Sequence, residues 1–139
     1  MEKCELADDI NVLFVQAQSF PAGIQPAFKE LESKLTNVPG RKFYGISWGN
    51  PDGKINYLAA ASQLNGDEAR QTGLQTFTIR KGIYMSQLIK DFMNDIPKIG
   101  ETFTQLLRHP ALDTKAYCVE RYKGNDVLCM VKLDSIKMK

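Results

Sequence analysis

The sequence predicts an α+β fold built from duplicated strand-helix-strand-strand units, with an antiparallel sheet, two main helices and a cleft between the halves. Segments rich in β-branched and aromatic residues alternate with segments whose apolar residues recur at helical spacing, and this order occurs twice. Residue types recur too, since Lys42 to Ser47 aligns with Lys115 to Glu120 at one constant offset. Two such repeats would pack with pseudo-twofold symmetry, and their seam would form the cleft, although a short α+β chain can show this similarity by chance.

The first repeat is expected over about residues 10–62. Its first ten residues have the composition of a strand, and Phe-Pro-Ala-Gly then turns the chain into a helix that presents Phe28, Leu31 and Leu35 on one face. The Pro-Gly pair after residue 38 should end that helix. Two strands follow, over residues 42–48 and 54–62, with Gly-Asn-Pro-Asp-Gly as the turn between them.

The second repeat is expected over about residues 74–133, after a polar linker. It begins with an extended segment that should kink or bulge at Gly82. A helix from about Asp95 to Arg108 and a hairpin closed by Lys-Gly-Asn-Asp complete the order. At 139 residues, the chain is long enough to bury one core, so a single domain over residues 1–139 is expected.

Composition and charge narrow the functional classes. The chain is 43% hydrophobic and 24% charged, and 18 basic against 16 acidic residues leave a net charge of +2. The basic residues are scattered without interleaved aromatics, so direct nucleic-acid binding is not predicted. The N-terminus lacks the apolar core of a signal peptide, and no apolar run approaches the roughly 20 residues of a membrane span. We therefore expect a cytoplasmic protein.

Metal and cofactor chemistry is not predicted either. Cys4, Cys118 and Cys129 form no CxxC pair and are odd in number, which is typical of a reducing compartment. His109, the single histidine, precedes Pro110 at a predicted helix end, where a solvated cap is the plain interpretation. The cysteines are therefore expected to have packing roles.

Glu120 stands out because it lies in a strand that otherwise appears buried on both faces. Aromatic and β-branched residues surround it, and the partner strand of the hairpin is equally apolar. A carboxylate removed from water costs several kcal/mol or takes up a proton, so it requires a partner, a cavity or a cationic ligand. Pairing with Arg121 or Lys132 at a sheet edge is the plain alternative to a functional role.

Four segments between about Val12 and Leu133 form a recognisable pattern. They are Pro39 to Ser47, Lys54 to Tyr57, Ile79 to Tyr84 and Glu120 to Tyr122. In this order they resemble the gyrase-inhibitor-like small-molecule-binding domain, a family that includes the effector-binding domains of bacterial multidrug-sensing transcription activators. No segment before Ile10 could hold the helix-turn-helix of such an activator, so we expect a stand-alone member.

The resemblance implies a duplicated fold with a ligand cleft, and a glutamate at the bottom of an aromatic pocket that binds cationic or lipophilic molecules. The matching glutamate here is Glu120. Because side chains alternate along a strand, Cys118 and Tyr122 share the face of Glu120, whereas Tyr44 and Tyr117 have the opposite parity. We expect these two tyrosines to pack under the helices. The candidate ligand-binding residues are Glu120, Tyr122, Cys118, Tyr84, Trp48 and Tyr57.

Three functional hypotheses follow. The first is a binding module that takes a small hydrophobic or cationic ligand, with Glu120 as its polar anchor. The second is a hydrolase of reactive electrophiles in which Glu120 acts as general acid or base. The third is a protein-interaction module like the gyrase inhibitors, for which the acidic N-terminal segment is the only candidate surface.

Overall fold

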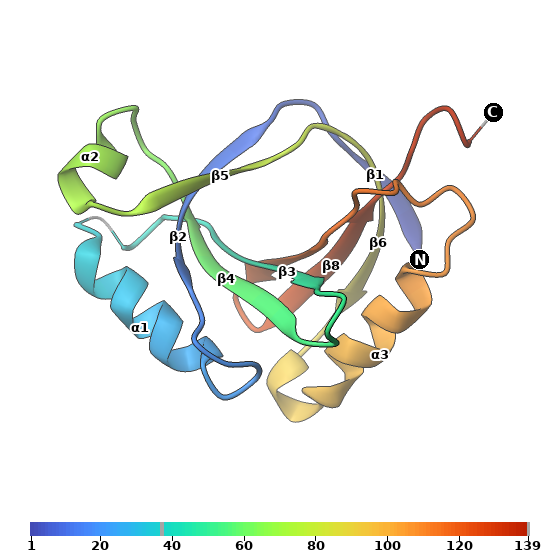
Figure 1. Ribbon diagram of the computed structural model, residues 1–139, viewed down its shortest axis with the longest axis horizontal. Coiled ribbons are helices and arrows are strands. Elements are labelled where there is room, and N and C mark those ends of the chain that lie inside the picture. The colour runs from blue at the N-terminus through green and yellow to red at the C-terminus, as the bar shows by residue number, and fades with distance from the viewer. Residues whose placement is uncertain (37, 139) are drawn as a thin grey trace. The chain divides into compact units, whose positions relative to one another are not determined.

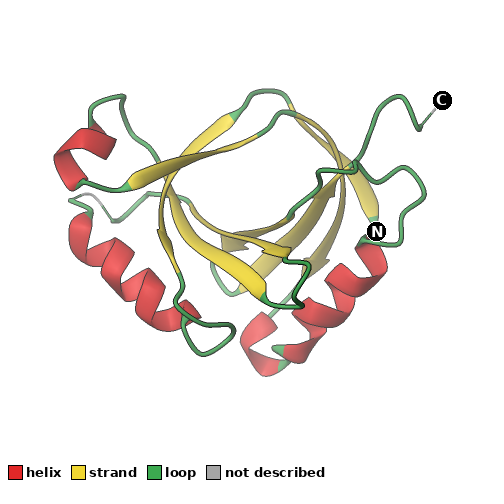
Figure 2. Ribbon diagram, viewed as in Figure 1, coloured by secondary structure: helices red, strands yellow, loops and turns green. Residues whose placement is uncertain are grey.

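The computed structural model describes residues 1–36 and 38–138, which form two compact units. The first unit is Ile10–Ile79, and the second combines Met1–Asp9 with the described chain from Arg80 onward. Both units are α+β, as the sequence predicted, with helices beside antiparallel strands (Figures 1 and 2). The described residues contain eight strands, four in each unit.

The first unit is a four-stranded sheet with one long helix. Its elements are β2 (Ile10–Gln16), α1 (Ile24–Lys34), β3 (Phe43–Gly49), β4 (Ile55–Ser62), α2 (Glu68–Thr72) and β5 (Gln75–Ile79). The strands lie in the order β3-β4-β2-β5, all antiparallel. Helix α1 packs against β2 and β4 (Figure 1).

Helix α1 docks through the apolar face that the sequence predicted. Leu31 is fully buried and packs with Leu13 of β2 and Ala61 of β4, while Phe28 extends the same cluster. Phe43 belongs to this cluster as well, so Tyr44, the next residue along β3, points to the opposite face of the sheet. The expectation that Tyr44 packs under the helix was therefore wrong.

The second unit repeats this plan. Its elements are β1 (Glu2–Leu6), β6 (Gly82–Ile89), the 3-10 turn η1 (Phe92–Asn94), α3 (Pro97–Leu106), β7 (Cys118–Lys123) and β8 (Asp126–Lys132). The strands lie in the order β1-β6-β8-β7, again all antiparallel. Helix α3 packs against β6 and β8 through Phe103 and Leu106.

The predicted duplication is confirmed by the strand pairings. In each unit a strand, a helix and a hairpin follow one another, and the last strand of the hairpin pairs with the first strand. Each unit also has one additional outer strand, β5 beside β2 and β1 beside β6. In the chain, β1 comes directly before β2 but pairs with β6, and β5 comes directly before β6 but pairs with β2. The two repeats therefore exchange these outer strands.

Three details differ from the sequence prediction. Residues 2–6 form β1, an element that the sequence analysis did not predict. The polar linker contains α2, which ends at Gly73 in the left-handed conformation (φ 75°). The extended segment around Gly82 is two separate strands, β5 and β6, and Gly82 itself has a φ of 141°. In the described chain, no helix has both the length and the apolar character that crossing a membrane would require.

Candidate ligand-binding site

Glu120 lies in the middle of β7, in the hairpin that the sequence predicted. The hairpin turns at Gly124, whose φ is 61°, and its register places Glu120 opposite Cys129 of β8, as expected for a turn centred on residues 124 and 125. Only 8% of Glu120 is exposed. The sequence therefore identified a carboxylate that is indeed buried.

The side chain of Glu120 belongs to the face of the second unit that α3 covers. Cys118 and Cys129 on this face pack in one cluster with Phe103 and Leu106 of α3, and Tyr122 packs against the same cluster. Because side chains alternate along a strand, Glu120 shares the face of Cys118 and Tyr122. The carboxylate is thus set in a surface that is otherwise apolar.

Tyr122 donates a hydrogen bond from its hydroxyl to Glu120 Oε1, at 2.7 Å. The Tyr122 ring is itself positioned by Phe92, with ring centroids 5.6 Å apart. A hydroxyl of this kind replaces part of the hydration that a carboxylate loses on burial. The two residues consequently form one polar group, a carboxylate with a tyrosine hydroxyl beside it, on an apolar wall.

Cys129 is a packing residue at this site. Burial, together with the negative charge of Glu120 across the hairpin and the nearby Cys118, raises the pKa of its thiol to about 12. A thiol with so high a pKa stays protonated near neutral pH, and the protonated form is a poor nucleophile. Among the described residues, no group of three or more His, Cys, Asp or Glu is arranged to hold a metal ion.

Lys132, which the sequence offered as a plain partner for Glu120, pairs with another carboxylate. Its Nζ lies 3.2 Å from Asp113 Oδ2. Alternation along β8 directs Lys132 to the face opposite that of Cys129 and Val131.

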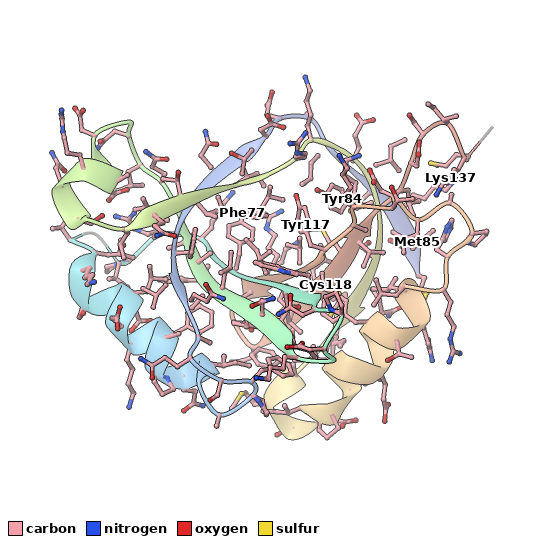
Figure 3. All side chains as sticks on the ribbon, in the orientation of Figure 1. Phe77, Tyr84, Met85, Tyr117, Cys118 and Lys137 are labelled. Carbon is pink, nitrogen blue, oxygen red and sulfur yellow. The ribbon has the colours of Figure 1, made fainter. Side chains whose placement is uncertain are left out.

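Tyr84 lies on the opposite face of the second unit from Glu120. Figure 3 labels Tyr84 and Met85, consecutive residues of β6, and Met85 packs against the α3 cluster, so Tyr84 points the other way. The Tyr84 hydroxyl donates to the Arg80 carbonyl oxygen at 2.6 Å, and the Tyr117 hydroxyl accepts from the Arg80 N–H at 3.0 Å. Burial, with Tyr117 beside it, raises the pKa of Tyr84. The Tyr117 hydroxyl is therefore held at Arg80, just before β6, and not under α3 as we expected.

Tyr57 and Trp48 belong to the first unit. Tyr57 is buried beneath α1, where its ring lies 6.3 Å from that of Phe28 and 6.1 Å from that of Phe20. Trp48 is half-buried on β3 and has the opposite side-chain direction, since its neighbour Ser47 pairs with Tyr57. The structure therefore brings Cys118, Glu120 and Tyr122 together. For Tyr84, Trp48 and Tyr57, ligand contact stays a prediction.

The first unit has a pocket that the sequence did not predict. It has a volume of about 580 Å³ and lies beside the N-terminal half of α1, where β2 continues beyond Gln75, the first residue of β5. Its lining combines apolar residues, such as Val15, Ala27 and Leu74, with the polar residues Gln16, Gln18, Ser19, Glu30 and Gln75. No local sequence pattern indicated this pocket, because it is formed where residues distant in the chain meet.

Sequence reasoning also missed a buried ion pair in the first unit. Arg41 donates to both carboxylate oxygens of Glu68, at 2.8 and 2.7 Å, and to the carbonyl oxygen of Ser62 at 3.0 Å. Glu68 in turn accepts from the Leu64 N–H at 2.9 Å. The Arg41 guanidinium holds the pKa of Glu68 below its usual range. Through Arg41, this ion pair links Glu68 of α2 to Ser62 of β4. We interpret it as a structural feature.

Comparisons with known proteins bear on the fold. No model of a known protein family matches the chain, and no curated protein does. Three solved structures are similar over nearly all of it. SAV2435 bound to tetraphenylphosphonium is 10% identical, with a TM-score of 0.62, covering 99% of this chain and 95% of that one. The integron cassette protein VCH_CASS2 from the mobile metagenome of Vibrio cholerae is 14% identical, with a TM-score of 0.60 and coverage of 96% and 95%.

A candidate bacterial transcription regulation protein from Staphylococcus aureus MU50 is 13% identical, with a TM-score of 0.55, covering 94% of this chain and 97% of that one. At such identities, the likeness is one of fold alone. It agrees with the fold that the sequence resemblance implied, since all three similarities extend over both repeats. The chain therefore has the fold of these three proteins.

Proposed function

We propose that this protein binds a small hydrophobic cation, and that the Glu120 carboxylate is the polar anchor of the ligand. The observation that carries the proposal is the buried Glu120 with its Tyr122 hydrogen bond on an apolar wall. One protein of the same fold is bound to tetraphenylphosphonium, a cation whose charge is enclosed by four phenyl rings. Another protein of this fold, from Staphylococcus aureus MU50, is a candidate transcription regulator, which is consistent with ligand sensing.

The apolar surface around Glu120 and Tyr122 suits such a ligand. Aromatic rings attract cations by roughly 0.5 to 2 kcal/mol each, and a carboxylate at low dielectric adds a direct charge partner. A lipophilic cation is poorly hydrated, so it loses little when it leaves water for an apolar surface. Tyr122 supplies an aromatic face and keeps the carboxylate oriented at the same time.

Tetraphenylphosphonium is the appropriate probe, and isothermal titration calorimetry the direct measurement. We expect saturable binding to the unmodified protein and at least a roughly tenfold weaker affinity for Glu120→Gln, because each lost 1.4 kcal/mol of charge interaction is a factor of ten. Glutamine keeps the shape and an oxygen acceptor for Tyr122, so the change removes mainly charge. Glu101→Gln is the matched control, since Glu101 is an exposed carboxylate on α3.

A neutral ligand separates charge recognition from apolar binding. Triphenylphosphine oxide has similar rings without the positive charge, so its affinity should be nearly the same for the unmodified protein and for Glu120→Gln. Equal affinity of tetraphenylphosphonium for the two proteins would show that Glu120 is not the anchor. Failure of the unmodified protein to bind either compound would overturn the proposal as a whole.

A second function is supported by the same pair of residues. With a hydroxyl 2.7 Å from a carboxylate, Glu120 can take a proton from water while the Tyr122 hydroxyl protonates a leaving oxygen. For an epoxide, water would add to carbon, the ring C–O bond would break, and Glu120 would return its proton to Tyr122. Diol formation detected by mass spectrometry, and lost in both Glu120→Gln and Tyr122→Phe, would establish hydrolysis. Binding without turnover would leave only the first function.

No observation favours the protein-interaction hypothesis on the acidic N-terminal segment. That segment is β1, which pairs with β6 through residues 2–6. Removing the residues before Ile10 would strip an outer strand from the second unit, so a loss of binding after such a truncation would not identify an interaction surface.

A further inference from the structure

The outer edge of β1 is an open row of backbone hydrogen-bonding groups. In the described part of the chain, β1 pairs only with β6. The Leu133 N–H donates to the carbonyl oxygen of Ile83, so the backbone N–H and C=O of Ile83 point toward the β8 side. Because these groups alternate along a strand, those of the neighbouring residues in β6 point toward β1. The hydrogen-bonded partners in β1 are then Glu2, Cys4 and Leu6.

Lys3 and Glu5 consequently direct their backbone N–H and C=O groups away from β6. The Ser86 hydroxyl supports this assignment, because it donates to the Glu2 carbonyl oxygen at 2.9 Å, on the β6 side. Both Lys3 and Glu5 are exposed. An edge strand with free backbone groups is a template for another strand, and proteins usually protect such edges with charges or proline.

The charges on β1 do not protect it against a second copy of itself. Lys3 and Glu5 are the residues whose backbone groups point away from β6. When two β1 strands pair antiparallel, such residues must lie opposite each other, and three registers near the middle of the strand satisfy this condition. Two of them place Lys3 opposite Lys3 or Glu5 opposite Glu5. The third places Lys3 of each copy opposite Glu5 of the other, and directly opposed unlike charges stabilise a cross-strand pair while like charges destabilise it.

We infer that two copies of this chain associate through β1, in an antiparallel pair with Lys3 of each copy opposite Glu5 of its partner. The interface is isologous, as in most homodimers, since the same strand is used by both copies. Cys4 then faces the partner's Cys4 across the twofold axis as a non-hydrogen-bonded pair, with the Cα atoms about 4.5 Å apart, within the range of a disulfide. This inference does not depend on the proposed ligand.

The experiment is a charge exchange followed by sedimentation equilibrium over a range of concentrations. The unmodified protein should dimerise reversibly, and Lys3→Glu or Glu5→Lys alone should each weaken the dimer by roughly tenfold or more, because two attractive pairs become two repulsive ones. An equimolar mixture of the two variants should dimerise, since every pair across that interface is then attractive. The doubly exchanged protein, Lys3→Glu with Glu5→Lys, should dimerise as the unmodified protein does.

Both side chains are exposed, so the variants should keep the circular dichroism spectrum and melting temperature of the parent. Mild oxidation gives an independent measurement, in which a reducible dimer forms in the parent, in the mixture and in the double exchange, but not in Cys4→Ser. Cys118 and Cys129 are buried and should not contribute. A monomeric parent at all concentrations, or a mixture that associates no better than the single variants, would overturn the inference.

Discussion

Two buried carboxylates are accommodated by different means in this protein. Glu68 accepts two hydrogen bonds from the Arg41 guanidinium and one from a backbone N–H. Glu120 accepts a hydrogen bond from the neutral hydroxyl of Tyr122 and lies on the apolar face beside α3. A carboxylate within a bidentate ion pair is part of the folded framework, so mutation of Glu68 should affect stability. The proposed anchor role of Glu120 predicts an effect on ligand binding instead.

Breaking the buried ion pair should be far more costly than breaking a similar exposed one. The Arg41 and Glu68 side chains are 0% and 6% exposed, whereas those of Arg70 and Asp67, which are also paired at 2.8 Å, are 82% and 67% exposed. We expect Arg41→Ala to lower the free energy of unfolding by about 3 to 5 kcal/mol, since it leaves Glu68 buried without its cation. Arg70→Ala should lower it by less than about 1 kcal/mol. Urea unfolding measures both, and equal effects would contradict the structural role of the buried pair.

The same pair makes stability depend on pH. The pKa of Glu68 in the folded protein lies below its ordinary value of 4.5, mainly because of the Arg41 hydrogen bonds. A lowered pKa in the folded state contributes stability that is fully present above the unfolded pKa and is lost as the pH falls through the folded pKa. The stability difference between the unmodified protein and Glu68→Gln should therefore be largest near neutral pH and shrink below about pH 4.5. A difference that stays constant down to pH 3 would show that Glu68 is not held ionised by Arg41.

At the scale of elements, the two long helices are built from the same pattern but begin differently. The residue before α1, Gly23, is packed directly on the backbone of residues 18 and 19, whereas α3 begins with Pro97. Each helix buries an apolar face against the first and last strands of its own repeat. This arrangement follows from periodicity, and the sequence analysis located both helices to within a few residues.

Two glycine substitutions test how each helix is fitted to its surroundings. A Cβ atom on Gly23 would lie 2.5 Å from the Ser19 carbonyl oxygen, so Gly23→Ala should destabilise the protein by about 1 to 3 kcal/mol. A Cβ atom on Gly100, inside α3 and exposed, would meet nothing within 4 Å, so Gly100→Ala should stabilise the protein by about 0.5 to 1 kcal/mol. Thermal unfolding measures both variants. A stabilising Gly23→Ala would contradict the close packing of Gly23, and a destabilising Gly100→Ala would contradict the open space at Gly100.

Elements that depend on partners distant in the sequence were harder to predict. Strand alternation grouped Cys118, Glu120 and Tyr122 correctly, but it did not show which face of the strand the helix covers, and Tyr44 and Tyr117 were assigned to the wrong one. Strand β1 has an unremarkable, charged sequence, and only its pairing with β6, some eighty residues later, makes it a strand.

At the scale of the whole molecule, ligand binding should be visible as a shift in thermal stability. A ligand present at 100 times its Kd stabilises the folded state by about 2.7 kcal/mol, which corresponds to a rise in Tm of roughly 5 to 15 °C for a chain of this size. Tetraphenylphosphonium should raise the Tm of the unmodified protein and of Glu101→Gln alike. At the same concentration, Glu120→Gln should show about half that shift or less, because its Kd is higher. Equal shifts in all three proteins would argue against the anchor.

The sequence by itself determined the α+β class, the order of the two repeats, the positions of the long helices and the buried hairpin in which Glu120 faces Cys129. These features are local, because periodicity and turn chemistry act over a few residues. Tertiary structure alone decided the exchange of β1 and β5, the Arg41–Glu68 pair, the pocket beside α1 and the meeting of Glu120 with the α3 face. Each of these requires segments distant in the chain to come together, and their local sequences carry no signal of the partner they will meet.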